Sequence, residues 1–206
     1  MPHPPRRSEF VAGAAGLDRL PAPTLPEIAV AGRSNVGKSS LLNRLLGRRA
    51  LARVSKTPGR TQQINFFAVD DRLQLADLPG YGFARVPLAV KEQWRKLVEG
   101  YLTRRQTLRG VVVLVDVRRG IEPDDAQLLA FLASHALPAL VIATKIDKLG
   151  RGARTQRLAQ LRRESGHVIA FSAVTGEGSA ELWSALDKMI TERKSSTQRR
   201  GGAETA

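Results

Sequence analysis

Short apolar runs alternate along the chain with longer stretches in which apolar residues recur at helical spacing. Uninterrupted apolar runs predict strands that are buried on both faces, as in a parallel sheet, at about 27–31, 111–115, 140–143 and 168–171. Residues 63–69 and 72–76 alternate around Asp70 and Asp71 instead, which predicts a hairpin of two strands. Helical spacing predicts helices over about 38–46, 87–104, 122–135, 154–164 and 179–190.

This order of elements predicts an α/β fold, with helices on both faces of a mostly parallel sheet of about six strands. Residues 23–192 are expected to form one domain, without an internal repeat or a second domain. The Pro- and Arg-rich residues 1–22 are expected to be an extended or loosely attached arm. The polar, basic residues 193–206 are expected to be a disordered tail.

The chain is strongly basic, with 33 Lys and Arg against 19 acidic residues, a net charge of +14 and a pI near 11.2. This excess indicates a polyanionic partner such as nucleic acid; a compositional bias toward Arg is the alternative. The absence of cysteine excludes disulfides, thiolate zinc sites and cysteine nucleophiles. No apolar run approaches the roughly 18 residues of a membrane helix, so no membrane partner is expected.

The positive charges gather in three places: the irregular stretch 48–60, the predicted helix near 154–164, and the tail. The residues concerned are Arg48, Arg49, Arg53, Lys56 and Arg60, then Arg151, Arg154, Arg157, Arg162 and Arg163, and finally Arg193, Lys194, Arg199 and Arg200. This clustering favours specific polyanion-binding surfaces over an evenly biased surface.

Residues 32–39 read Gly-x-x-x-x-Gly-Lys-Ser, the pattern of a phosphate-binding P-loop, and lie between a predicted strand and a predicted helix. Glycines let several backbone N–H groups point at one phosphate, and the helix N-terminus adds its positive end. Lys38 would reach the β- and γ-phosphates, and the Ser39 hydroxyl would ligate Mg²⁺. An ordinary Gly-rich turn is the alternative, which the flanking elements disfavour. The predicted phosphate-site residues are Gly32, Arg33, Ser34, Asn35, Val36, Gly37, Lys38, Ser39 and Ser40.

Asp77, Leu78, Pro79 and Gly80 follow a predicted strand directly, so they would meet the P-loop at the carboxyl edge of the sheet. In a P-loop site, the Asp77 carboxylate would hold Mg²⁺ through water. The Gly80 N–H would bond a γ-phosphate oxygen, because no side chain is in the way. A simple strand-to-turn sequence is the alternative.

The irregular stretch 48–62 contains Thr61, whose hydroxyl could ligate Mg²⁺ while its backbone N–H touches the γ-phosphate. This contact would exist only in the triphosphate state, so the stretch would act as a switch. Thr57 is a rival for this role, and a turn threonine is the alternative for both.

Thr144, Lys145, Ile146 and Asp147 follow another predicted strand and are the candidate base-reading residues. The Asp147 carboxylate could accept hydrogen bonds from N1–H and N2–H₂ of guanine together, and adenine offers no such donor pair. The Lys145 stem could lie along the base plane. After the last strand, Phe171, Ser172 and Ala173 would close over the base with backbone N–H groups. A charged strand end is the alternative.

Together these segments resemble a Ras-like P-loop GTPase domain, and more specifically the bacterial EngB-type GTPases, also called the YihA family, of the TrmE–Era–EngA–YihA group. The resemblance covers about residues 10–190 and rests on GRSNVGKSSLL (32–42), TPGRTQ (57–62), DLPGYG (77–82), TKID (144–147) and FSA (171–173). It implies a nucleotide site that also includes Gly59, Arg60, Thr61, Gln62 and Gln63. Thr144 departs from the broader GTPase pattern, where Asn is commoner, but a hydroxyl can still donate to the P-loop.

The resemblance implies hydrolysis of GTP to GDP and phosphate, with Mg²⁺ held by Ser39, Thr61 and Asp77 and with Lys38, Thr61, Gly80 and Asn35 as the catalytic residues. It also implies a cytoplasmic protein, expected to be a monomer, that acts with ribosomal RNA in assembly of the large ribosomal subunit and in cell division and septation. A binding module with a structural nucleotide is the alternative; a small-molecule kinase or ATPase would have no use for Asp147.

Two residues bear on catalysis. Tyr81 occupies the position at which Ras-type enzymes carry a water-orienting Gln, so intrinsic hydrolysis is expected to be slow. Asn35 resembles the P-loop Asn that helps some related GTPases hold K⁺ beside the phosphates. The alternative, that Asn35 only suits the turn, stays open.

Overall fold

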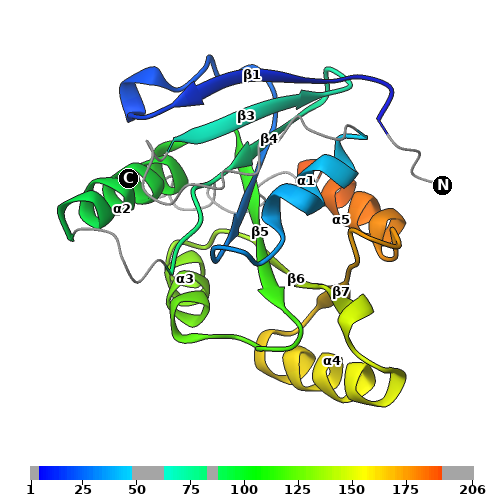
Figure 1. Ribbon diagram of the computed structural model, residues 1–206. Coiled ribbons are helices and arrows are strands. Elements are labelled where there is room, and N and C mark those ends of the chain that lie inside the picture. The colour runs from blue at the N-terminus through cyan, green and yellow to red at the C-terminus, as the bar shows by residue number, and fades with distance from the viewer. Residues whose placement is uncertain (1–4, 48–62, 83–87, 192–206) are drawn as a thin grey trace, which may run out of the picture.

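A computed structural model describes residues 5–47, 63–82 and 88–191, with side chains from residue 92 onward in the last range (Figure 1). Seven strands within these ranges form one sheet in the order β1-β3-β4-β2-β5-β6-β7. All neighbours from β4 to β7 are parallel, whereas β3 runs antiparallel to β1 and β4. The strands are β1 (Ser8–Ala14), β2 (Glu27–Gly32), β3 (Ile64–Val69), β4 (Leu73–Asp77), β5 (Leu108–Asp116), β6 (Ala139–Thr144) and β7 (Val168–Ala170). The predicted α/β class and mostly parallel sheet are confirmed.

Helices cover both faces of the sheet because the strand side chains alternate between two apolar layers. One layer packs Leu41, Leu42 and Leu45 of α1 and Leu182, Trp183 and Leu186 of α5 against the sheet. The opposite face is covered by α2 and α3 and, toward β7, by α4. The helices are α1 (Lys38–Leu45), α2 (Leu88–Arg104), α3 (Pro123–Ser134), α4 (Arg151–Ser165) and α5 (Ser179–Thr191), with 3₁₀ turns at Leu17–Arg19 and Ile146–Lys148. None of these helices is long and apolar enough to cross a membrane.

Strand β1 corrects the expectation of an extended or loosely attached N-terminal arm. Residues 8–14 pair with β3, with a shift in register between Phe10 and Ala12, and the Ser8 hydroxyl donates to the Leu46 carbonyl at 2.6 Å. The prolines that suggested an arm flank this strand and none lies within it. The strand raises the count from the expected six to seven, and its formation depends on β3, which lies about 55 residues farther along the chain.

Smaller differences concern element ends. Helix α4 begins at Arg151 rather than near Arg154. Helix α5 begins at Ser179, as expected, and the Ser179 hydroxyl donates to the Gly176 carbonyl at 2.7 Å. Helix α3 does begin with a capping box, in which the Asp125 carboxylate accepts from the Glu122 N–H at 3.0 Å.

Candidate nucleotide-binding site

The carboxyl ends of five parallel strands bring the predicted site segments to one edge of the sheet. The P-loop leaves β2 at Gly32, and Asp77 closes β4 beside it. Thr144 closes β6, and Ser172 follows β7. Ligands of open α/β sheets bind at this edge, so the segments that were separated in the sequence can act on one ligand.

The P-loop backbone has the shape that its glycines allow. Gly37 has a φ of +106°, in the left-handed region that disfavours a side chain. A Cβ on Gly32 would lie 2.9 Å from Val36 Cγ1 and 3.2 Å from the carbonyl oxygen of Leu114, which β5 cannot easily move. Glycine at both positions therefore lets the loop fold tightly against the end of the sheet.

Lys38 and Asp77 form an ion pair between the start of α1 and the end of β4. Both side chains are nearly buried, with 12% and 11% of their surface exposed. Lys38 and Asp77, which are predicted to contact the phosphates and Mg²⁺, therefore lie within contact distance of each other.

The Thr144 hydroxyl makes the hydrogen bond to the P-loop that an Asn amide commonly makes at this position. It donates to the Val36 carbonyl of the P-loop at 2.7 Å and is within 3.2 Å of the Val115 carbonyl. Thr144 is buried, so its contact with the P-loop is shielded from water. The expectation that a hydroxyl could still donate is confirmed.

Replacing Thr144 by Val is expected to weaken GDP and GTP binding to a similar degree, by roughly 1–3 kcal/mol, because the buried Val36 carbonyl loses its donor. Thr144→Ser, which keeps the hydroxyl, is the matched control and should bind within a few-fold of the unchanged chain. Titration with fluorescent GDP and GTP analogues would measure both constants. Full affinity in Thr144→Val would show that the P-loop needs no brace from β6.

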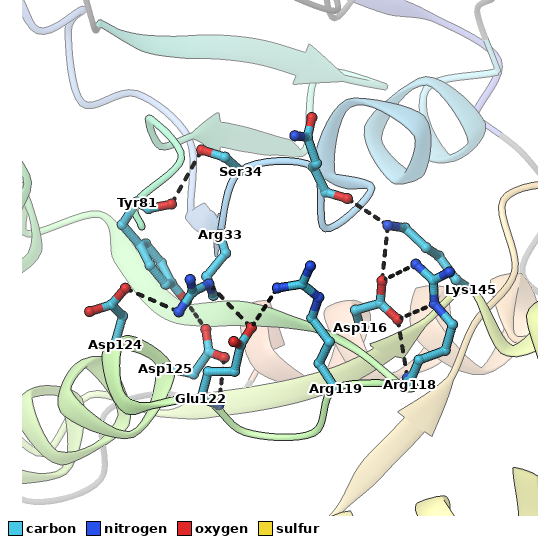
Figure 2. A network of polar contacts seen from close by, with 11 residues as sticks. Arg33, Ser34, Tyr81, Asp116, Arg118, Arg119, Glu122, Asp124, Asp125 and Lys145 are labelled. Atoms are coloured by element: carbon cyan, nitrogen blue, oxygen red, sulfur yellow. Dashed lines mark hydrogen bonds and ion pairs between the residues drawn. The ribbon is translucent and has the colours of Figure 1, made fainter. Parts of the chain in front are cut away.

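Lys145 connects the segment 144–147, which is predicted to read the base, to Asn35 of the P-loop. Its ammonium donates to the Asn35 carbonyl at 2.6 Å and to Asp116 Oδ2 at 3.0 Å. Burial opposes ionisation of Asp116, but hydrogen bonds from Arg118 and Lys145 outweigh it and hold the pKa of this carboxyl far below its usual range. Arg118 donates two hydrogen bonds to Asp116, from Nε to Oδ1 at 2.9 Å and from Nη2 to Oδ2 at 2.7 Å (Figure 2). Lys145 is therefore held between two fixed acceptors.

Asp116, at the end of β5, was not among the residues predicted from the sequence. Its signal was available, because it closes the apolar run 111–115 on β5, which pairs with β2 and shares its carboxyl edge. A carboxylate at a strand end beside a P-loop is a candidate site residue on position alone.

Asp147 is oriented by Ser172. The buried Ser172 hydroxyl donates to Asp147 Oδ1 at 2.7 Å, and this hydrogen bond lowers the pKa of the Asp147 carboxyl. The Ser172 oxygen in turn accepts from the backbone N–H groups of Val174 and Thr175, both at 3.2 Å. The serine after the last strand thus orients the carboxylate that is predicted to read the base, a role for Ser172 that was not predicted from the sequence.

On the other flank of the P-loop, Arg33 and Tyr81 contact the start of α3 (Figure 2). A cavity of about 160 Å³ lies here, lined by Arg33, Asn35, Asp116, Arg119, Glu122 and Lys145 among others. These polar contacts join the P-loop and the residue after Gly80 to the start of α3.

Most of the predicted residues of the irregular stretch fall in the range 48–62, which is not among the described residues. Gly59, Arg60, Thr61 and Gln62 lie outside the described residues, as does Thr57. Gln63 is described just before β3, with its side-chain amide donating to Asn65 Oδ1 at 2.9 Å. Asn65 pairs with Asp77, so Gln63 lies near the site edge of the sheet. The switch assignment of Thr61 stays a prediction.

Three features together define a P-loop GTPase domain. The sheet is mostly parallel and carries a P-loop, an acidic residue at a strand end contacts the P-loop lysine, and a Thr-Lys-x-Asp segment contacts the same loop. A protein-family profile described as 50S ribosome-binding GTPase matches residues 27–145. The chain belongs to the EngB family of GTP-binding GTPases, given this match and relatives that are more than 40% identical over most of their length.

Two such relatives are named "probable GTP-binding protein EngB". The one from Citrifermentans bemidjiense is 46% identical, and the match covers 93% of this chain and 92% of the relative. The one from Solibacter usitatus is also 46% identical, with coverage of 91% and 98%. A crystal structure of a probable GTP-binding protein engB is 28% identical with a TM-score of 0.65, covering 81% of this chain and all of that one. Aquifex aeolicus Era bound to GDP and aluminium fluoride shares the fold, at 22% identity and a TM-score of 0.66, over 83% of this chain and 58% of that one.

Proposed function

We propose that this GTPase is a Mg²⁺-dependent switch that acts in assembly of the large ribosomal subunit. The observation that carries the proposal is the match of residues 27–145 to a family described as 50S ribosome-binding GTPases. The proposal extends to a monomeric, cytoplasmic protein and to a role in cell division and septation, which rests on the family resemblance alone.

Mg²⁺ would be held by Ser39 and Asp77, with Thr61 joining them in the triphosphate state. Asp77 offers a carboxylate at the end of β4, and Ser39 offers a hydroxyl in the first turn of α1, next to Lys38. Mg²⁺ prefers such oxygen donors, is commonly bound through one or two carboxylates together with substrate phosphates, and keeps several water ligands. The bound ion would neutralise charge on the β- and γ-phosphates.

The exposed side of α4 supports an RNA partner. Arg151, Arg162 and Arg163 are exposed, and Lys148, just before the helix, has 58% of its side chain exposed. Arg154 is occupied by an ion pair with Glu177. Lys148 lies 3.6 Å from the Asp147 carboxylate. Arg151, Arg162 and Arg163 form no ion pair within the described part of the chain, and exposed arginines of this kind suit contacts to phosphates. The two other basic clusters lie outside the described residues.

Sedimentation with purified large ribosomal subunits tests this proposal. Binding should favour a GTP analogue over GDP and should fall steeply with salt. Arg162→Gln with Arg163→Gln should weaken binding by roughly tenfold if each arginine neutralises one phosphate. The same charge change at Arg95 and Lys96, both exposed on α2, is the matched control and should bind like the unchanged chain. Equal binding in both nucleotide states would refute the switch, and salt-independent binding would refute the RNA surface.

A second candidate is a binding module whose nucleotide is a structural ligand with negligible turnover. One observation favours it: Tyr81, at the position of the water-orienting Gln, has its hydroxyl engaged by Asp125 at 2.8 Å. Multiple-turnover GTP hydrolysis with and without large subunits separates the two candidates. The switch requires stimulated turnover, whereas the module predicts the same negligible rate in both.

We expect hydrolysis to be faster in K⁺ than in Na⁺ if Asn35 helps to hold K⁺. Asn35 has a φ of +64°, a left-handed conformation that Asn tolerates, which is also what the turn alone would need. Asn35→Gly keeps the turn and removes the side chain, so it should abolish the K⁺ advantage while leaving GDP affinity unchanged. Equal initial rates in the two buffers would leave Asn35 with the turn role only.

A further inference from the structure

Tyr81 extends the pairing of β2 and β4 beyond the end of the strands. Its N–H donates to the Gly32 carbonyl at 3.4 Å, and its carbonyl accepts from the Ser34 N–H at 2.9 Å. The Ser34 hydroxyl also donates to the Tyr81 carbonyl, at 3.2 Å. Gly80, one residue earlier, therefore lies directly against the P-loop, where a Cβ on it would be 3.3 Å from Ser34 Oγ.

The side chain of Tyr81 reaches away from the P-loop to α3 (Figure 2). Its hydroxyl donates to Asp125 Oδ1 at 2.8 Å, while Asp125 Oδ2 accepts from the Glu122 N–H in the capping box of α3. Asp125 is only 1% exposed. Burial, followed by the proximity of Asp125, raises the pKa of Tyr81, so its hydroxyl remains a donor at any physiological pH. The contact thus joins Tyr81 to a carboxylate that the helix start already holds in place.

Arg33 makes a second connection between the P-loop and the same helix start. Its Nε lies 3.3 Å from Glu122 Oε2, and its Nη1 lies 3.2 Å from Asp124 Oδ2. Arg119 approaches the same Glu122 carboxylate at 3.6 Å. The first half of the P-loop and the residue after Gly80 are therefore both tied to the first turn of α3, so neither can shift against the other without breaking one of these contacts.

We propose that Tyr81 is a positioning residue that, through its hydrogen bond to Asp125, holds the Gly80 N–H where it can meet the γ-phosphate. Gly80 has no side chain with which to fix itself, so its place depends on its neighbours, and the anchored neighbour is Tyr81. The inference rests on the proposed contact of Gly80 with the γ-phosphate. Because GDP has no γ-phosphate, the hydroxyl of Tyr81 matters for GTP and not for GDP.

The test compares Tyr81→Phe with Tyr101→Phe, since the chain has only two tyrosines. The Tyr101 hydroxyl donates to Glu27 at 2.9 Å at the amino end of β2, so its loss is the same chemical change at the opposite end of the sheet. Gly80→Ala serves as the direct probe of Gly80 itself. For each chain, dissociation constants for GDP and for a non-hydrolysable GTP analogue are measured, together with the single-turnover hydrolysis rate.

Tyr81→Phe should lower the affinity for the GTP analogue roughly three- to tenfold, because one hydrogen bond is lost. It should also lower the rate of hydrolysis and leave the affinity for GDP within twofold of the unchanged chain. Tyr101→Phe should leave the ratio of the two affinities unchanged. If Gly80→Ala weakens the GTP analogue selectively but Tyr81→Phe weakens both nucleotides equally or neither, the positioning role is refuted and the role of Gly80 stands. If Gly80→Ala shows no nucleotide preference, the proposed γ-phosphate contact itself is refuted.

Discussion

Changing Asp147→Asn is expected to weaken GTP and GDP binding by roughly 2–4 kcal/mol, about 30- to 1,000-fold, because a charged acceptor of two hydrogen bonds is lost. The structure sharpens this expectation, since Ser172 holds one carboxylate oxygen in place at 2.7 Å and most of the side chain is shielded from water. The Asn side chain offers one acceptor and one donor. It should therefore favour xanthine nucleotides, which carry an oxygen at C2.

Competition binding with GTP, xanthosine triphosphate and ATP would measure this change. Asp18→Asn is a suitable control, because Asp18 is 83% exposed on the 3₁₀ turn after β1. Ser172→Ala should give an intermediate loss without a switch in base preference, since it releases the carboxylate but keeps its charge. ATP competing with GTP at similar concentration for the unchanged chain would contradict the base-reading role of Asp147.

The fold was predictable where the apolar pattern is local. Each strand from β2 to β7 and each helix was expected within a few residues, because an apolar run or a helical repeat is contained in a short stretch. Strand β1 was not, because it exists only through pairing with β3, and flanking prolines dominated its composition. An edge strand of this kind is selected by its partner rather than by its own propensity.

The candidate site, like the fold, could be predicted where its residues form short local motifs. Lys38, Asp77, Thr144 and Asp147 lie in short motifs whose spacing carries the chemistry. The contacts that position site residues are not local in the sequence: Ser172 lies 25 residues from Asp147, and Asp125 lies 44 residues from Tyr81. No local pattern links such pairs, and only the folded chain shows that Asp147 and Tyr81 are each held by a distant side chain.

Replacing Lys38 by Met should lower single-turnover GTP hydrolysis by roughly 100- to 1,000-fold, because a preorganised charge at the transferring phosphoryl group is lost. It should also destabilise the domain, since the nearly buried Asp77 loses its ion-pair partner. Both effects follow from one contact, so a hydrolysis measurement alone would not show which of them is responsible.

The double variant Lys38→Met with Asp77→Asn separates the two effects. It removes both charges of the pair, so the free energy of unfolding in urea should recover much of what Lys38→Met loses, whereas hydrolysis should remain as low as in the single variant. Lys96→Met, at an exposed position of α2, is the control for removing a lysine charge. If hydrolysis returned together with stability, the lysine would serve only to neutralise Asp77. Continued loss in a restored fold would show that lost stability does not explain the lost hydrolysis, and Asp77→Asn alone, measured beside it, would give the part of the loss that comes from the Mg²⁺ ligand and not from Lys38.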